Sequence, residues 1–296
     1  MLTGTELITS IETCQLDYGQ CCLWWLGQHS FIVKLGKTTC FFDLFLTPSA
    51  ERNVQPFLKP HEINNADFIF GSHDHADHID RPIWPLLAKS SPNSIFIVPE
   101  AIREQLCDDL KISPKRVVGL DDALSFEKDG IKITAVAAAH EFLDCDKVGH
   151  NMYLGYCIEG NGCKVYHAGD TCNYEGLQTS LKQINPHIML LPINGRDAKR
   201  FASGCIGNMT YQEAADLAGV CKPCLVIPTH YDMFVANTED PMLFADYMNV
   251  KYPNLNVHIC QYAERVIVSL SDSKVCRDER FTLCDNLSRK RNCHIS

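Results

Sequence analysis

A dense group of metal-binding side chains stands in the segment His73-Asp-His-Ala-Asp-His78. Five of these six residues carry an imidazole or a carboxylate, and the segment comes two residues after the apolar run Phe68-Ile-Phe70. In a tight loop at a strand end, His73 and His75 can bind one ion while Asp77 and His78 bind a second ion nearby. The alternative is a polar turn whose imidazoles only cap backbone groups. So many donors in one loop favour a two-metal hydrolytic site.

Three further candidate ligands each follow an apolar run elsewhere in the chain. His140 follows residues 131–139, Asp170 follows residues 165–169 and His230 follows residues 225–229. Proteins with mixed α and β structure build their sites from strand ends that meet at one edge of a sheet. For the two histidines the alternative is a hydrogen-bonded histidine in the core or in a turn. We expect all three residues to join the first group.

Short apolar runs bounded by turn residues continue from Cys21 to Leu270 without a linker. The predicted strands cover residues 22–26, 30–35, 38–43, 68–71, 94–98, 131–139, 151–158, 164–167, 188–192, 225–228, 257–260 and 265–269. The predicted helices cover residues 82–89, 100–110, 175–183, 211–218 and 241–249, and Thr210 with Glu213 forms a capping-box pattern before the fourth of them. We expect an α/β (α+β) protein, with one αβ/βα sandwich domain over residues 1–270 and a loosely held tail over residues 271–296.

The composition is that of an ordinary globular protein, with 46% hydrophobic and 21% charged residues among 296. No apolar run approaches the roughly 20 residues of a membrane span, and the first residues lack the pattern of a signal peptide. We therefore expect a cytoplasmic protein with no membrane partner. The net charge of −9 argues against nucleic acid as a partner.

The Cys221-Lys-Pro-Cys224 spacing is that of a redox or zinc motif, but without a second such pair we expect plain turn thiols.

The motifs resemble those of the metallo-β-lactamase superfamily, and within it those of the L-ascorbate-6-phosphate lactonase-like branch. The resemblance spans about residues 23–268 and rests on Trp24-Trp-Leu-Gly27, Ser72-His-Asp-His-Ala-Asp-His-Ile-Asp80, Tyr166-His-Ala-Gly-Asp-Thr171, Gly207-Asn-Met-Thr210 and Val226-Ile-Pro-Thr-His-Tyr-Asp232. It implies a four-layer αβ/βα sandwich and a homo-oligomer. It also implies the ligand sets, which are His73, His75 and His140 for one metal, Asp77, His78 and His230 for the other, and Asp170 between them.

The chemistry expected of this ligand set is hydrolysis. Five imidazoles and two carboxylates suit Mn²⁺ or Zn²⁺, as two ions or as one, and such ions lower the pKa of a bound water so that hydroxide can attack a carbonyl or a phosphorus. Asp77 and His230 are the candidate catalytic residues, and Asp77 could orient the hydroxide or return a proton to the leaving oxygen. The resemblance favours a phosphorylated sugar lactone as substrate. A phosphodiesterase or nuclease on the same binuclear site and a mononuclear iron redox enzyme are the alternatives.

Other polar residues are candidates for supporting roles. Asp43 follows Thr38-Thr-Cys-Phe-Phe42 and could fix an imidazole tautomer. His29 could reach the site from a strand turn, and the alternative for both residues is an ordinary role in a turn. The basic loop of residues 194–208 supplies three candidate cations for the phosphate of a small phosphorylated substrate, which are Arg196, Lys199 and Arg200. The alternative for these three is solvated surface charge.

Overall fold

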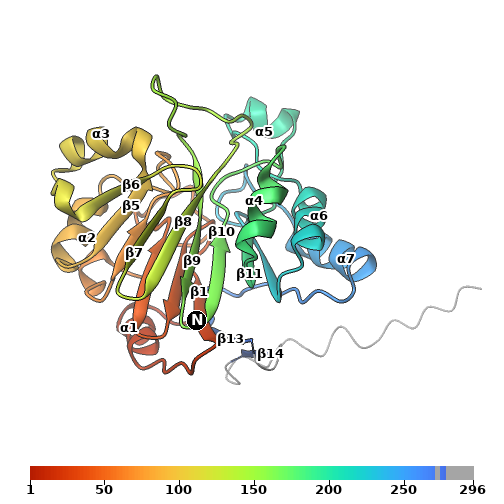
Figure 1. Cartoon of the computed structure of the whole chain (residues 1–296), viewed down its shortest axis with the longest axis horizontal. Helices are drawn as coiled ribbons and strands as arrows, with labels where there is room; N and C mark the ends of the chain where they lie inside the picture. The colour runs from red at the N-terminus through yellow and green to blue at the C-terminus, as the bar shows by residue number, and fades with distance from the viewer. Residues whose placement is uncertain (271–273, 278–296) are drawn as a thin grey trace, which may run out of the picture.

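The structure is a computed structural model, and it describes residues 1–270 and 274–277 (Figure 1). The described strands are β1 (Gln20–Trp25), β2 (Phe31–Leu35), β3 (Thr38–Phe42), β4 (Phe68–Phe70), β5 (Ile95–Pro99), β6 (Val117–Leu120), β7 (Ser125–Lys128), β8 (Ile131–Ala137), β9 (Leu154–Gly160), β10 (Cys163–His167), β11 (Ile188–Pro192), β12 (Leu225–Thr229), β13 (Val266–Ser269) and β14 (Lys274–Arg277). The described α-helices are α1 (Gly4–Glu12), α2 (Trp84–Ser90), α3 (Glu100–Leu110), α4 (Leu177–Ile184), α5 (Ala198–Ala202), α6 (Tyr211–Cys221) and α7 (Pro241–Lys251). Two short 3-10 helices are Pro60–Glu62 and Pro114–Arg116.

The strands form two sheets. The first has the order β14-β13-β1-β2-β3-β4-β5-β6, and the second has the order β12-β11-β10-β9-β8-β7. Strands that follow one another through hairpins are antiparallel, as in β1-β2-β3 and β7-β8-β9-β10. Strands joined through longer connections are parallel, as in β3-β4-β5-β6 and β10-β11-β12. Such parallel pairs need crossovers: the one from β3 to β4 is a long loop with the 3-10 helix Pro60–Glu62, and the others contain α2, α3, α4 and α6.

Both faces of the first sheet are buried, which explains its nearly continuous apolar strands. In β1, Leu23 points into a core shared with the second sheet, and the next residue, Trp24, points into an outer core with α1 and α2. The outer core includes Leu7 and Leu87 from these two helices. Figure 1 shows α2 and α3 on one side of the sheets and α4, α6 and α7 on the other. The predicted αβ/βα sandwich is therefore confirmed.

The strand directions bring the predicted ligands to one edge. Strands β3 and β4 are parallel, so Asp43 and His73 follow strand ends at the same edge of the first sheet. In the second sheet β8 is antiparallel to β9, which is antiparallel to β10, and β10 to β12 run parallel. The ends of β8, β10 and β12 therefore lie together, and His140, Asp170 and His230 follow them.

Several local predictions differ from the structure. The predicted strand at 257–260 is wrong, because only Val257 pairs there, through an isolated bridge to Val226 of β12. Helix α1 and strands β6 and β7 were not predicted. The capping box of Thr210 and Glu213 is confirmed at the start of α6. The predicted loose tail 271–296 lies outside the described residues, except for β14, which pairs with β13. No described helix is long and apolar enough to cross a membrane.

Candidate metal centre

The histidine-rich segment forms a tight loop after β4. The amide of Ile79 donates to the carbonyl of His75 at 2.8 Å, and the amide of His78 donates to the same carbonyl at 3.0 Å. The loop packs closely because residue 71 is glycine: a Cβ there would lie 2.4 Å from the Cγ1 of Ile79 and 3.0 Å from the ring of Trp84. The buried side chains of Ile79 and Trp84 thus anchor the loop that carries the predicted ligands.

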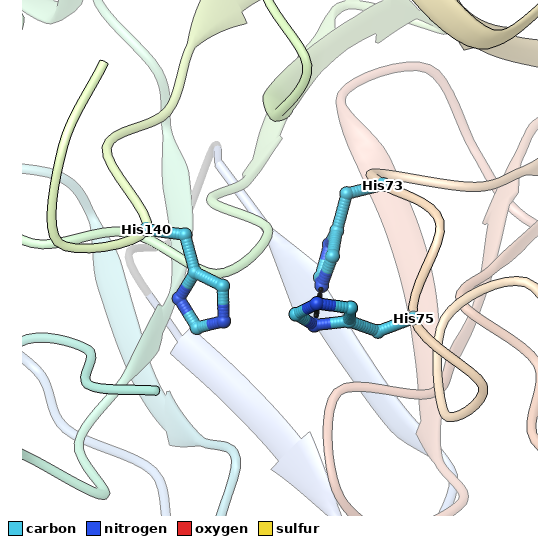
Figure 2. Close-up of side chains that lie close together, drawn as sticks. All are labelled: His73, His75 and His140. Atoms are coloured by element: carbon cyan, nitrogen blue, oxygen red, sulfur yellow. Dashed lines mark hydrogen bonds between the residues drawn. The ribbon is translucent and has the colours of Figure 1, made fainter. Parts of the chain in front are cut away.

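His73, His75 and His140 form the first group of potential ligands, with donor atoms within 4.8 Å of one another. Nε2 of His73 lies 2.9 Å from Nδ1 of His75, and the His140 ring centre lies 5.4 Å from that of His73. Figure 2 shows His140 facing the other two rings from the opposite side, that is, from the second sheet. The group therefore joins the two halves of the sandwich.

Asp77, His78 and His230 form the second group, and Asp170 lies between the two groups. The Oδ1 atom of Asp170 lies 3.4 Å from Nε2 of His78 and 3.1 Å from Nε2 of His230. Its other oxygen, Oδ2, lies 3.7 Å from Nε2 of His140. Asp170 can therefore reach ions in both groups. The structure brings all seven predicted ligands together.

These residues fit divalent ions in two respects. Ligand atoms about 2.1 Å from a tetrahedral ion lie about 3.4 Å apart, and the separations around Asp170 are of that size. In addition, Nε2 of His78 and Oδ1 of Asp170 are buried and have no hydrogen-bond partner within the described part of the chain. Buried polar atoms usually have hydrogen-bond partners. The unpaired Nε2 of His78 and Oδ1 of Asp170 lie 3.4 Å apart, and together they mark a position where both could bind one cation. Imidazole and carboxylate donors suit Zn²⁺, Mn²⁺ or Fe²⁺.

The electrostatics of the group also favour a cation. Burial and the neighbouring His78 hold the pKa of His73 well below its usual value, so this imidazole is neutral and can act as a ligand. Burial opposes ionisation of Asp170, but His230 and His78 hold its pKa well below the usual value of a carboxyl. Burial likewise disfavours charge on His78, yet Asp170 and Asp77 raise its pKa well above the usual value. The carboxylates thus favour positive charge at His78, which a proton supplies when no ion is bound and a divalent ion on Nε2 would supply in its place.

Asp43 supports the centre from the first sheet. Its Oδ2 lies 2.6 Å from Nδ1 of His78 and accepts a hydrogen bond from the Ser72 hydroxyl at 2.7 Å, while its Oδ1 accepts from the Ser72 amide at 2.8 Å. The carboxylate thereby orients His78 with Nε2 toward Asp170. Asp43 has a φ of +46°, a left-handed conformation that aspartate and asparagine adopt more readily than most residues.

His29 lies behind the ligands and not among them. Its ring is fully buried and lies 3.9 Å from the ring centre of His167, against 5.9 Å for His230 and 6.1 Å for His78. Burial and the neighbouring His167 hold its pKa well below the usual value. The structure therefore places His29 as a neutral packing group that supports the ligand rings.

Two supporting residues were not predicted from the sequence. The Gln28 amide group donates to Oδ2 of Asp77 at 3.0 Å, and the Gln28 carbonyl accepts from the His230 amide at 2.8 Å. Nδ1 of His140 lies 3.1 Å from the side-chain oxygen of Asn208, which leaves Nε2 of His140 for a metal. Both residues are buried and each orients a ligand from another part of the chain.

The three cations predicted to bind phosphate lie on or near α5 and have protein partners. Arg196 donates to both oxygens of Glu213, at 2.6 and 2.7 Å, and this contact raises its pKa. Arg200 donates to Asp197 and to the carbonyl of Thr238. Lys199 is exposed, and its backbone amide donates to Asp197. None of the three lines the cavity at the ligands.

A cavity of about 510 Å³ opens over the ligands. Its base includes five of the predicted ligands, which are His75, Asp77, His140, Asp170 and His230. Its walls come from three loops, with Phe45, Ser49 and Glu51, with Gly204, Cys205 and Ile206, and with Phe234, Ala236 and Asn237. This volume is typical of a site for a small molecule.

Neither Cys221 nor Cys224 belongs to a group of potential metal ligands in the described part of the chain.

Comparison with known proteins agrees with the geometry. Residues 38–231 match the family model described as beta-lactamase superfamily domain. A UPF0173 metal-dependent hydrolase of Thermococcus onnurineus is 30% identical over 220 residues, which cover 74% of this chain and 88% of the relative. One of Thermoplasma acidophilum is 29% identical over 221 residues, covering 74% and 87%. Among solved structures, a metallo hydrolase of Ignicoccus hospitalis is similar in fold, with a TM-score of 0.64, 22% identity, and coverage of 84% of this chain and 98% of the other.

Proposed function

The chain belongs to the metallo-β-lactamase superfamily, and we propose that it is a metal-dependent hydrolase that opens a lactone. The observation that carries the proposal is the convergence of five imidazoles and two carboxylates below one cavity, with Asp170 within reach of both groups. Divalent ions bound there would acidify water and polarise a carbonyl. The similar proteins of Thermococcus onnurineus and Thermoplasma acidophilum are named as metal-dependent hydrolases, without a substrate.

Each ligand group has a distinct task in this proposal. His73, His75 and His140 would hold one ion, and the second would be held by Asp77, His78 and His230, with Asp170 shared. Asp77 lines the cavity, and its Oδ2 accepts a hydrogen bond from Gln28. From that position the Asp77 carboxylate can take a proton from an attacking water and return it to the leaving oxygen. In a lactone the leaving oxygen remains tethered, so the product is a single hydroxy acid.

The phosphorylated sugar lactone predicted from the sequence is a narrower version of this proposal. It requires a cation for the phosphate, and the exposed Lys199 is the candidate that is not already bound to a carboxylate side chain, in contrast to Arg196 and Arg200. Loss of one charge-assisted hydrogen bond costs about 1.5 to 3 kcal/mol. Lys199→Ala should then lower kcat/KM for a phosphorylated lactone by roughly tenfold or more and leave its unphosphorylated analogue unchanged. Equal rates for wild type and variant on both substrates would remove the phosphate from the proposal.

The decisive experiment combines metal analysis with substrate panels. Protein purified without added metal is analysed for Mn, Zn and Fe, stripped with a chelator, and reloaded with each ion. Hydrolysis is then measured on lactones, phosphorylated lactones and phosphodiesters, and oxygen consumption is followed with the iron form. We expect lactone opening that is lost on stripping and restored on reloading. Activity confined to phosphodiesters would favour the nuclease-type alternative, and metal-independent activity would refute the proposal.

A further inference from the structure

We propose that the cavity binds an uncharged, apolar group of the substrate, of the size of a phenyl ring, beside the reacting carbonyl. This inference rests on the proposed function and names the substrate class of the same site. It comes from the residues that line the cavity above the ligands, which no part of the hydrolytic chemistry uses.

One wall of the cavity is apolar. The rings of Phe45 and Phe234 lie with their centres 6.1 Å apart and are tilted by 45°, and Ile206 and Ala236 also line the space. The side chain of Ile206 is 40% exposed, although it is large and apolar. Burying such apolar surface against a ligand is favourable. The wall is therefore suited to an aromatic or branched aliphatic group.

The aromatic pair is held in place before any substrate binds. The guanidinium of Arg52 lies 4.6 Å from the ring centre of Phe45 and donates to the Phe45 carbonyl at 2.9 Å. Arg52 also pairs with Phe234 through an isolated bridge, and the Asn53 amide donates to the carbonyl of Met233 at 2.8 Å. These bonds tie the two loops that carry the rings. A preformed wall loses little conformational freedom when a ligand binds.

The charges that line the cavity disfavour an anionic group on the part of the substrate that lies away from the metal ions. The lining residues include the carboxylates of Glu51, Asp77 and Asp170, and no lysine or arginine is among the lining residues that the structure describes. The arginines of the neighbouring loop, Arg196 and Arg200, are bound to carboxylates. Lys199 of that loop has no carboxylate partner among the described residues, but it does not line the cavity, so an anion bound here would meet like charges without a lining cation. The remote part of the substrate is therefore neutral.

Exposed apolar side chains adjoin the lining segments along the chain. Val235, between the lining residues Phe234 and Ala236, is 79% exposed, and Phe201 of α5 is 73% exposed. Helix α5 leads directly into the lining segment that contains Ile206. Exposed large apolar side chains next to the lining segments are consistent with a binding surface.

A binding experiment tests the inference without relying on turnover. Calorimetry on metal-loaded protein compares acetohydroxamate with 4-phenylbutanohydroxamate and with the monohydroxamate of glutaric acid, three probes with the same metal-binding group. We expect the phenyl probe to bind at least tenfold more tightly than acetohydroxamate and the carboxylate probe to bind no better than it. In a hydrophobic pocket a single methylene group already changes discrimination by roughly 10- to 200-fold.

Two cavity variants and one control locate the effect. Phe234→Ala and Ile206→Ala should each reduce the advantage of the phenyl probe severalfold while the affinity for acetohydroxamate stays unchanged, which reports an intact metal site. Val250→Ala on α7, where the side chain is 86% exposed, should change neither affinity. Equal affinities for phenyl and acetyl probes in the wild type, or tightest binding of the carboxylate probe, would overturn the inference.

A kinetic comparison separates this inference from the proposed function. Neutral lactones with a methyl or a benzyl substituent on the same ring should differ at least tenfold in kcat/KM in favour of benzyl, and Phe234→Ala should reduce that ratio. Failure to hydrolyse any lactone would refute the proposed function, while the hydroxamate affinities would still decide the inference. Hydrolysis of both lactones at the same rate would support the function and overturn the inference.

Discussion

Replacing Asp43 by Asn tests how the protein orients the ligand His78. The Asp43 carboxylate is fully buried, lies 2.6 Å from Nδ1 of His78 and accepts two hydrogen bonds from Ser72. Asparagine keeps the shape of the side chain and tolerates the φ of +46°, so the change removes the charge without adding backbone strain. The imidazole then loses the charge-assisted partner that makes its Nε2 a stronger ligand.

The expected loss follows from that single contact. Removal of such a carboxylate–histidine partner typically lowers metal affinity by roughly 10- to 100-fold, which corresponds to about 1.4 to 2.7 kcal/mol. We expect this loss for the ion held by His78, and a smaller change for the ion held by His75 and His140, because neither of those rings contacts Asp43. The variant should bind two ions with clearly different affinities.

The assay is a competition titration of apo protein against a chromophoric chelator, for wild type and Asp43→Asn. Asp246→Asn on the exposed side of α7 is the matched control, because it removes the same charge far from the site in the fold. Chemical unfolding of the apo forms checks that the variant is folded. Affinities for both ions within twofold of the wild type would refute the reasoning that Asp43 orients a metal ligand.

Three further predictions concern the centre and its surroundings. Asp170→Ala should remove more than about 99% of the activity and lower the affinity for both ions while the protein stays folded, because this carboxylate reaches both ligand groups. Activity assays and metal analysis check this prediction, and full activity would contradict it. Gly71→Ala should destabilise the protein by about 1 to 3 kcal/mol in chemical unfolding, since the new Cβ would lie 2.4 Å from Ile79; an unchanged midpoint would show that the loop yields easily. The double variant Cys221→Ser, Cys224→Ser should keep wild-type activity and metal content under reducing conditions, because neither thiol is a potential ligand in the described residues; a loss of metal would indicate a thiol ligand.

The ligands could be predicted from the sequence because their signal is local. Four of them stand in one short segment, and each of the others comes shortly after an apolar strand. Their convergence follows from strand direction alone, because parallel strands end at the same edge.

The supporting hydrogen bonds could not be predicted, since each joins distant parts of the chain. Gln28 meets Asp77 across 49 positions and Asn208 meets His140 across 68, and neither glutamine nor asparagine has a spacing that reveals its partner. Helix α1 was also missed. Its amphipathic pattern is clear only once Leu7 and Ile11 are seen against the outer face of the first sheet.

The basic loop shows why charge in a sequence is a poor guide to anion binding. Arg196 is bonded to Glu213, a residue of the predicted capping box that also accepts from the Thr210 amide. The sequence identifies Glu213 as a capping residue, but its second contact depends on how α6 meets the preceding loop. Whether a cation is free for a ligand is thus decided by tertiary structure.

The ligands come from both sheets, so bound ions would act as cross-links between the two halves of the sandwich. His73, His75 and His78 lie in the loop that follows β4 of the first sheet, and His140 and His230 follow strands of the second. An ion that binds only the folded chain stabilises it by about 2.7 kcal/mol when its free concentration is 100 times its dissociation constant. The lifetime of this protein would then depend on the supply of metal, and a cell short of the ion would lose the protein by unfolding and proteolysis as well as losing its activity.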